Sequence, residues 1–67
     1  MARVLVIDDD QSLLRALRLG LKARGHDVIT SASGEDGISQ TALGDPDVIV
    51  LDLGLPDMDG LAACRRI

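Results

Sequence analysis

Two groups of aspartates, each directly after an apolar run, are the residues of this chain whose types and spacing could do chemistry. Asp8–Asp10 follow the run 3–7, and Asp52 follows the run 48–51. Short runs rich in valine, isoleucine and leucine are typical of buried parallel strands. Ligands collect just beyond the carboxyl ends of such strands, and neighbouring strands lie only about 4.8 Å apart. Converging carboxylates repel one another unless a cation lies between them, so the pattern predicts a divalent-metal pocket around a reactive carboxylate.

Length and composition limit the classes of protein that this chain could represent. Its 67 residues make one small domain, and a chain of that size buries only about 60% of the surface that its unfolded form exposes. The single cysteine, Cys64, allows no internal disulfide and favours a cytoplasmic protein. We find no signal peptide and no apolar stretch of membrane-spanning length. The net charge of −4 argues against direct nucleic-acid binding by this segment.

The elements that must position the aspartates alternate between strand and helix. We expect strands at 3–7, at Asp27 to about Ala32 and at 48–52, helices from about Gln11 to Arg24 and from Ser33 through Ala42, and a third helix that begins within 60–67. The apolar stripe of the first helix contains Leu14, Leu17 and Leu21, joined by Leu13.

Helix-ending signals agree with these bounds. Asp10 or Asp9 is placed to cap the first helix, and Gly25 stops it as a left-handed residue would. Ser33 caps the second helix, although Gly34 and another glycine three residues later lower its helix propensity.

Right-handed crossovers between parallel strands restrict the topology. The first and third strands are the most apolar and should be adjacent, while the more polar second strand suits an edge, giving the order 2-1-3. This is half of a doubly wound α/β sheet. The outer edge of the third strand would then be open and hydrophobic, and we expect the chain to be truncated.

Two motifs, Val4–Asp10 and Leu51–Gly60, strongly resemble the receiver domain of two-component response regulators, and the resemblance covers all 67 residues. The second motif looks most like regulators that carry a winged-helix DNA-binding domain, particularly the potassium-responsive Kdp type. The resemblance implies a flavodoxin-like fold in which 1–67 is the N-terminal part of the receiver domain. It also implies a cytoplasmic signalling module rather than an enzyme, which takes a phosphoryl group from a sensor histidine kinase to control transcription.

The family's site residues carry over by position. Asp52 matches the aspartate that accepts the phosphoryl group, Asp9 the carboxylate that binds Mg²⁺ directly, and Asp8 the carboxylate that holds it mainly through water. The backbone carbonyl of Gly54 matches the third protein ligand. Pro56 and Gly60 shape the loop that aims this carbonyl. The chemistry agrees, because Mg²⁺ takes one or two carboxylates plus phosphate oxygens and a carboxylate can act as a nucleophile.

The chain departs from the family pattern in what it does not contain. Receiver domains also use a Ser or Thr at the end of a fourth strand and a Lys at the end of a fifth strand, and the only lysine here, Lys22, lies in the first helix. In the family, the lysine at the end of the fifth strand stabilises the charge that develops during phosphoryl transfer. Contacts with DNA would come only from an effector domain absent from these residues.

Structural roles account for the remaining polar residues. We assign Asp10 to a helix cap, Asp57 and Asp59 to loop and cap geometry, His26 to an exposed turn, Cys64 to a small buried apolar position, and Arg65 and Arg66 to a solvated face or a helix end.

Two other functions compete with the receiver hypothesis. The segment Asp8–Ser12 also fits the D-x-D-x-[ST] pattern of haloacid-dehalogenase-like phosphatases, in which Asp8 would be the nucleophile and Asp10 the acid/base. In that case the covalent phosphoryl group forms on Asp8 instead of Asp52. Alternatively, the segment acts by association alone, through the open edge of the third strand.

Overall fold

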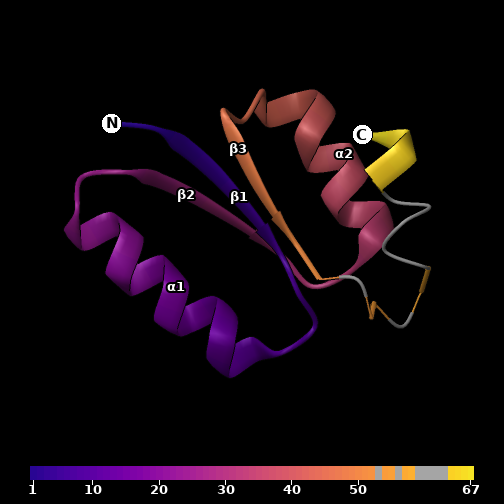
Figure 1. The fold of residues 1–67 in the computed structure, drawn as a ribbon, viewed down its shortest axis with the longest axis horizontal. Helices are drawn as coiled ribbons and strands as arrows, with labels where there is room; N and C mark the ends of the chain where they lie inside the picture. The colour runs from indigo at the N-terminus through magenta and orange to yellow at the C-terminus, as the bar shows by residue number, and fades with distance from the viewer. Residues whose placement is uncertain (53, 56, 59–63) are drawn as a thin grey trace.

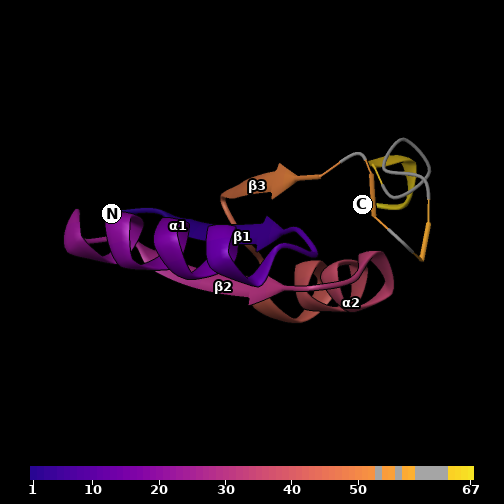
Figure 2. The same ribbon diagram turned by 90° about the horizontal axis from the view of Figure 1, so that it is seen from below.

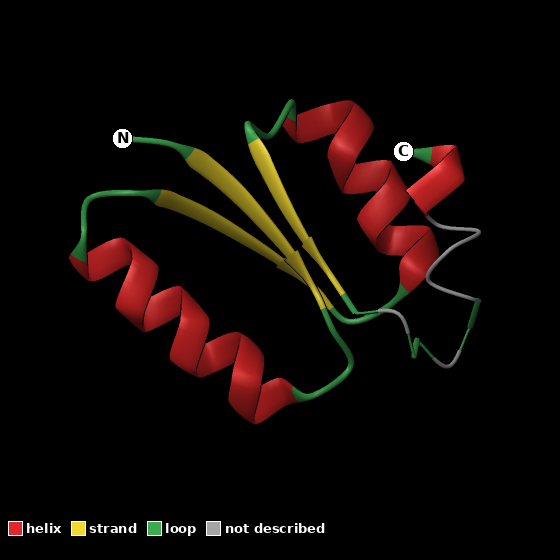
Figure 3. Ribbon diagram, viewed as in Figure 1, coloured by secondary structure: helices red, strands yellow, loops and turns green. Residues whose placement is uncertain are grey.

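The computed structural model describes residues 1–52, 54–55, 57–58 and 64–67 and contains alternating strands and helices (Figures 1 and 3). In chain order the elements are β1 (Arg3–Ile7), α1 (Gln11–Ala23), β2 (Asp27–Ser31), α2 (Gly34–Gly44) and β3 (Val48–Leu51). The predicted order is confirmed. The second and third strands each end one residue earlier than expected, and α2 runs two residues further.

The three strands form one parallel sheet in the order β2-β1-β3, as predicted. All three arrowheads point the same way in Figure 2, so the carboxyl ends of the strands share one edge of the sheet. The register pairs Ile7 of β1 with Ser31 of β2 on one side and with Leu51 of β3 on the other. The polar strand β2 lies at the edge, where a solvated side chain costs little.

The central strand β1 has both faces buried, since α1 and α2 flank the sheet on opposite sides (Figure 1). Val4 and Val6 pack against Leu14 of α1, together with the leucine stripe predicted from the sequence. Leu5 and Ile7, both fully buried, point to the other face. This alternation along one short strand is the pleat of a β-strand, in which successive side chains leave opposite faces.

Helix α1 begins and ends at the predicted signals. The Asp10 carboxylate accepts hydrogen bonds from the backbone N–H groups of Ser12 and Leu13, and Gly25 adopts the left-handed region at φ +88°. One prediction is wrong, because Leu13 is exposed rather than part of the buried stripe. It is one residue from Leu14, a rotation of about 100° around the helix, which carries it off the buried face.

Helix α2 lies so close to the sheet that its glycines are needed for packing. A Cβ on Gly37 would lie 2.5 Å from Cδ1 of the fully buried Ile7. Glycine lowers the helix propensity of α2, but it allows the helix to approach β1 closely. Ser33 caps the helix as predicted, since its hydroxyl oxygen accepts from the N–H of Asp36.

Two single-residue predictions are wrong. His26 is half-buried, and its Nδ1 accepts a hydrogen bond from the backbone N–H of Ala2 at 2.9 Å, because the start of β1 passes beside the turn that precedes β2. Cys64 is exposed. It lies in the helical turn 64–66, whose Arg66 pairs with Glu35 of α2.

The strand β3 is less covered than its neighbours. Val48 and Val50 remain 49% and 44% exposed, on the same face of the sheet as Val4 and Val6, with which they pair. The start of the predicted third helix, at 60–63, lies outside the described residues. None of the helices in the described part of the chain has the length and apolar character that a membrane span requires.

Candidate metal and phosphoacceptor site

The register of the sheet brings the two aspartate groups to one place. Asp8 and Asp52 each come one residue after the last pair of the β1–β3 ladder, Ile7 and Leu51. The backbone N–H of Asp52 donates to the carbonyl of Ile7 at 2.9 Å, and that of Asp8 donates to the carbonyl of Ser31 at 3.0 Å. Sheet hydrogen bonds therefore continue up to both aspartates, so their backbone positions are set by the ladder itself.

Three carboxylates converge beyond this edge. One oxygen from each of Asp8, Asp9 and Asp52 lies within 4.8 Å of the others, and Asp9 is exposed while the other two are half-buried. The convergence predicted from the sequence is confirmed. Carboxylate oxygens suit a hard cation such as Mg²⁺, which binds them at about 2.1 Å and keeps several waters. The three oxygens are close enough to share one cation.

Short local hydrogen bonds orient two of these carboxylates. Oδ1 of Asp8 accepts the backbone N–H of Asp10 at 2.9 Å, and Oδ1 of Asp52 accepts the backbone N–H of Gly54 at 2.9 Å. Both acceptors serve a donor two residues later in the chain, as aspartates do in turns. Each carboxylate is thereby tied to the loop that follows its own strand.

The remaining predicted site residues are placed only in part. Gly54 is an exposed turn residue two positions after Asp52, and the role of its carbonyl as a metal ligand stays a prediction. Pro56, Asp59 and Gly60 lie outside the described residues.

The Asp57 carboxylate caps the start of α2, a partner that the sequence analysis did not name. Its Oδ1 accepts the backbone N–H of Gly34 at 2.8 Å, and its Oδ2 accepts that of Glu35 at 3.0 Å. These bonds, first to Glu35 and then to Gly34, hold the pKa of the Asp57 carboxyl below its usual 3.8. The cap role that we assigned to Asp57 is confirmed, but the helix is α2, more than twenty residues earlier, and no local signal could identify it.

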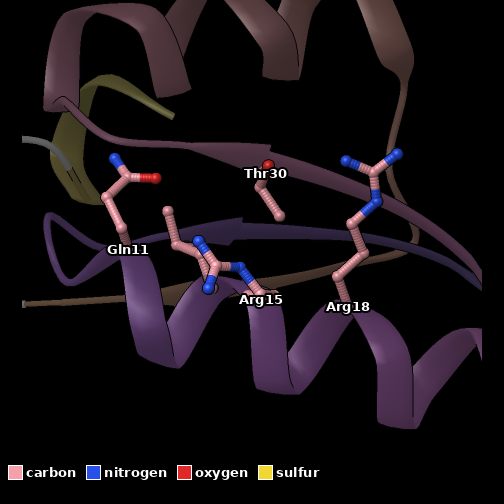
Figure 4. A pocket seen from close by; sticks show the side chains of 5 residues that line it. Gln11, Arg15, Arg18 and Thr30 are labelled. Atoms are coloured by element: carbon pink, nitrogen blue, oxygen red, sulfur yellow. The ribbon is translucent and has the colours of Figure 1, made fainter.

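A separate hollow of about 170 Å³ lies between α1 and β2 (Figure 4). It is lined by Gln11, Leu14, Arg15, Arg18 and Thr30. None of the three converging carboxylates takes part in it, so it is distinct from the candidate site.

Comparison with known proteins agrees with this geometry. A family model described as the response regulator receiver domain matches residues 4–67. Over 61 residues the chain is 52% identical to the transcriptional regulatory protein KdpE of Mycobacterium tuberculosis, covering 91% of this chain and 27% of KdpE. Over its full length it is 49% identical to the transcriptional regulatory protein AfsQ1 of Streptomyces coelicolor, 30% of which it covers. The chain thus spans less than a third of these curated relatives.

A solved structure shows the same fold. The N-terminal domain of a response regulator receiver protein from Methanoculleus marisnigri superposes with a TM-score of 0.95 at 30% sequence identity. The match covers all of this chain and 55% of that chain. The flavodoxin-like arrangement and the similarity to the Kdp type that the motifs predicted are confirmed.

Proposed function

Because this chain belongs to the response regulator receiver domain family, we propose that it takes up a phosphoryl group on Asp52 in two-component signalling. The donor would be a phosphohistidine of a sensor histidine kinase. A carboxylate oxygen of Asp52 attacks phosphorus, the P–N bond to the histidine breaks, and an aspartyl phosphate remains. Asp52 suits this role because it ends β3 at the open carboxyl edge of the sheet and is only half-buried.

Asp8 and Asp9 are the residues that would hold Mg²⁺ beside the acceptor, Asp9 directly and Asp8 mainly through water, with the carbonyl of Gly54 as a third ligand. When bound, Mg²⁺ neutralises charge on the phosphoryl group as it moves. The single observation that supports this proposal is the convergence of three carboxylate oxygens within 4.8 Å. Carboxylate oxygens gathered in this way can share one divalent cation.

The helix cap made by Asp10 favours the receiver role over the phosphatase role. In the phosphatase hypothesis Asp10 is the acid/base, but the Asp10 carboxylate accepts from the N–H groups of Ser12 and Leu13 at the start of α1. A carboxylate that already caps a helix is poorly placed to exchange protons with a substrate. The receiver hypothesis needs Asp10 only as a cap.

The role of the whole protein follows as a further proposal. The relatives KdpE and AfsQ1 are transcriptional regulatory proteins. We propose that this chain likewise controls a DNA-binding regulator in the cytoplasm, and that an effector domain outside these 67 residues makes the DNA contacts.

Intact mass after incubation with Mg²⁺ and acetyl phosphate tests the site. The wild-type protein should gain one phosphoryl group, Asp52→Asn should gain none, and omission of Mg²⁺ should slow the gain severely. Circular dichroism of each variant checks that it is folded. A phosphoryl group that is lost in Asp8→Asn but kept in Asp52→Asn would support the phosphatase role instead.

The exposed edge of β3 supports a second candidate, self-association. Val48 and Val50 leave an apolar surface beside that edge, and open strand edges can pair with a second copy. Sedimentation velocity across a range of concentrations tests this. A monomer throughout would exclude it.

A further inference from the structure

The first turn of α2 is held by two segments that come much later in the chain. Its N–H groups at Gly34 and Glu35 have no acceptor within the helix, as at every helix start. The Asp57 carboxylate accepts a hydrogen bond from each of them. Arg66 Nη1 donates to Oε1 of Glu35 at 2.7 Å. A negative side chain is also favourable at the positive end of the helix dipole.

Asp57 belongs to the loop that begins at the proposed phosphoacceptor. The Asp52 carboxylate accepts a hydrogen bond from the N–H of Gly54. The residue after Gly54, Leu55, is 6% exposed and packs with Leu5 and Ile7. The loop is therefore attached at three points: the end of β3, the core beneath it, and the start of α2. Gly54 lies between the first two points, and Asp57 adds the third.

Gly34 of α2 also lies close to Asp57 and Met58 of the loop. A Cβ on Gly34 would lie 2.5 Å from Cγ of Met58 and 3.3 Å from Oδ1 of Asp57. A larger residue at position 34 would therefore require the Met58 side chain to move. This contact makes the position of the loop depend on the position of the helix, and the converse.

From these contacts we propose that Asp57 is a positioning residue of the phosphoacceptor site. By anchoring the loop on α2, it keeps Gly54 beside the Asp52 carboxylate, where the glycine carbonyl would act as the third ligand of the Mg²⁺ held by Asp8 and Asp9. The inference rests on the proposed function. If the Asp57 contact strengthens Mg²⁺ binding, then Mg²⁺ binding must strengthen the Asp57 contact by the same factor. Mg²⁺ should therefore stabilise the start of α2.

A Mg²⁺ titration followed by the Gly54 amide signal in NMR tests the proposal. Removing the anchor in Asp57→Ala should weaken Mg²⁺ binding about fivefold, the lower end of usual coupling between sites. Asp57→Asn keeps the shape and one acceptor oxygen and should fall between Asp57→Ala and the wild type. Ser33→Ala is the matched control, because it removes a local cap of the same helix turn and leaves the Asp57 contact in place.

Two further readouts separate positioning from a general loss of structure. At saturating Mg²⁺, Asp57→Ala should take up phosphate from acetyl phosphate at the wild-type rate, since only the metal affinity has changed. In the wild type, Mg²⁺ should slow hydrogen exchange at the Gly34 and Glu35 amides by the same factor of about five.

The outcomes are distinguishable. Equal Mg²⁺ affinity in Asp57→Ala and the wild type overturns the positioning role, as does a loss in Ser33→Ala as large as that in Asp57→Ala. A wild-type protein that neither binds Mg²⁺ nor gains a phosphoryl group overturns the proposed function, and the positioning role with it. Weaker binding in Asp57→Ala alone, with normal phosphorylation at saturating Mg²⁺, supports both.

Discussion

The two loops that carry aspartates to the edge of the sheet are held in opposite ways. The loop after β1 is self-contained: Asp8 accepts from Asp10, and Asp10 caps the helix that follows directly. The loop after β3 depends on distant parts of the molecule, since Leu55 enters the core and Asp57 reaches α2. The Asp57 contact can form only once α2 has packed beside this loop.

This difference divides the candidate site into a local half and a dependent half. The metal ligands proposed directly after β1, Asp8 and Asp9, rely on their own loop and on the backbone bond from Asp8 to Ser31 of β2. The acceptor Asp52 and its following glycine need the packed sheet, the buried leucine and α2 together. Substitutions that remove one support at a time can test this division.

The largest expected effect comes from the core anchor of the second loop. Leu55→Ala should lower the free energy of unfolding by about 2–5 kcal/mol, because it leaves a cavity between Leu5 and Ile7. Urea unfolding followed by circular dichroism measures it. Leu13→Ala is the control, since Leu13 is 41% exposed and lies near the first loop, and it should change stability by about 0.5 kcal/mol or less. Equal effects in the two variants would contradict the division.

An intermediate effect is expected from the cap that ends the first loop. Asp10→Ala removes the acceptor for the Ser12 and Leu13 amides and should lower the free energy of unfolding by about 1 kcal/mol. Amide exchange should quicken at Ser12 and Leu13 and stay unchanged at Gly34. Asp10→Asn, which keeps a capping oxygen, should lose little. Faster exchange at Gly34 would show that the two loops are coupled.

The smallest effect is a pH dependence that belongs to the second loop. The pKa of Asp57 is lowered in the folded protein by the Glu35 and Gly34 amides, so its stabilising contribution is fully present above the ordinary value of 3.8 and is lost as the pH falls through the lower, folded pKa. The stability difference between the wild type and Asp57→Asn should therefore shrink as the pH falls below 3.8 and through the lower pKa of the folded protein. Urea midpoints at several pH values measure it, and a difference that is constant across this range would contradict the contact.

What could be read from the sequence is what short-range physics controls. The strands follow from apolar runs, and the bounds of α1 follow from Asp10 and Gly25, whose side chain or backbone acts within a few residues. The meeting of Asp8 and Asp52 could also be predicted, because parallel strands share one carboxyl edge and the two most apolar strands had to be neighbours.

What only the tertiary structure decided are contacts between segments that the chain separates widely. His26 is covered because the start of β1 passes beside it, and Cys64 is exposed on a turn whose Arg66 pairs with Glu35 of α2. The two hydrogen-bond donors to Asp57, Glu35 and Gly34, lie 22 and 23 residues away in the sequence. No periodicity or cap signal reaches that far, since such a contact exists only once the helix and the loop have packed on the same sheet.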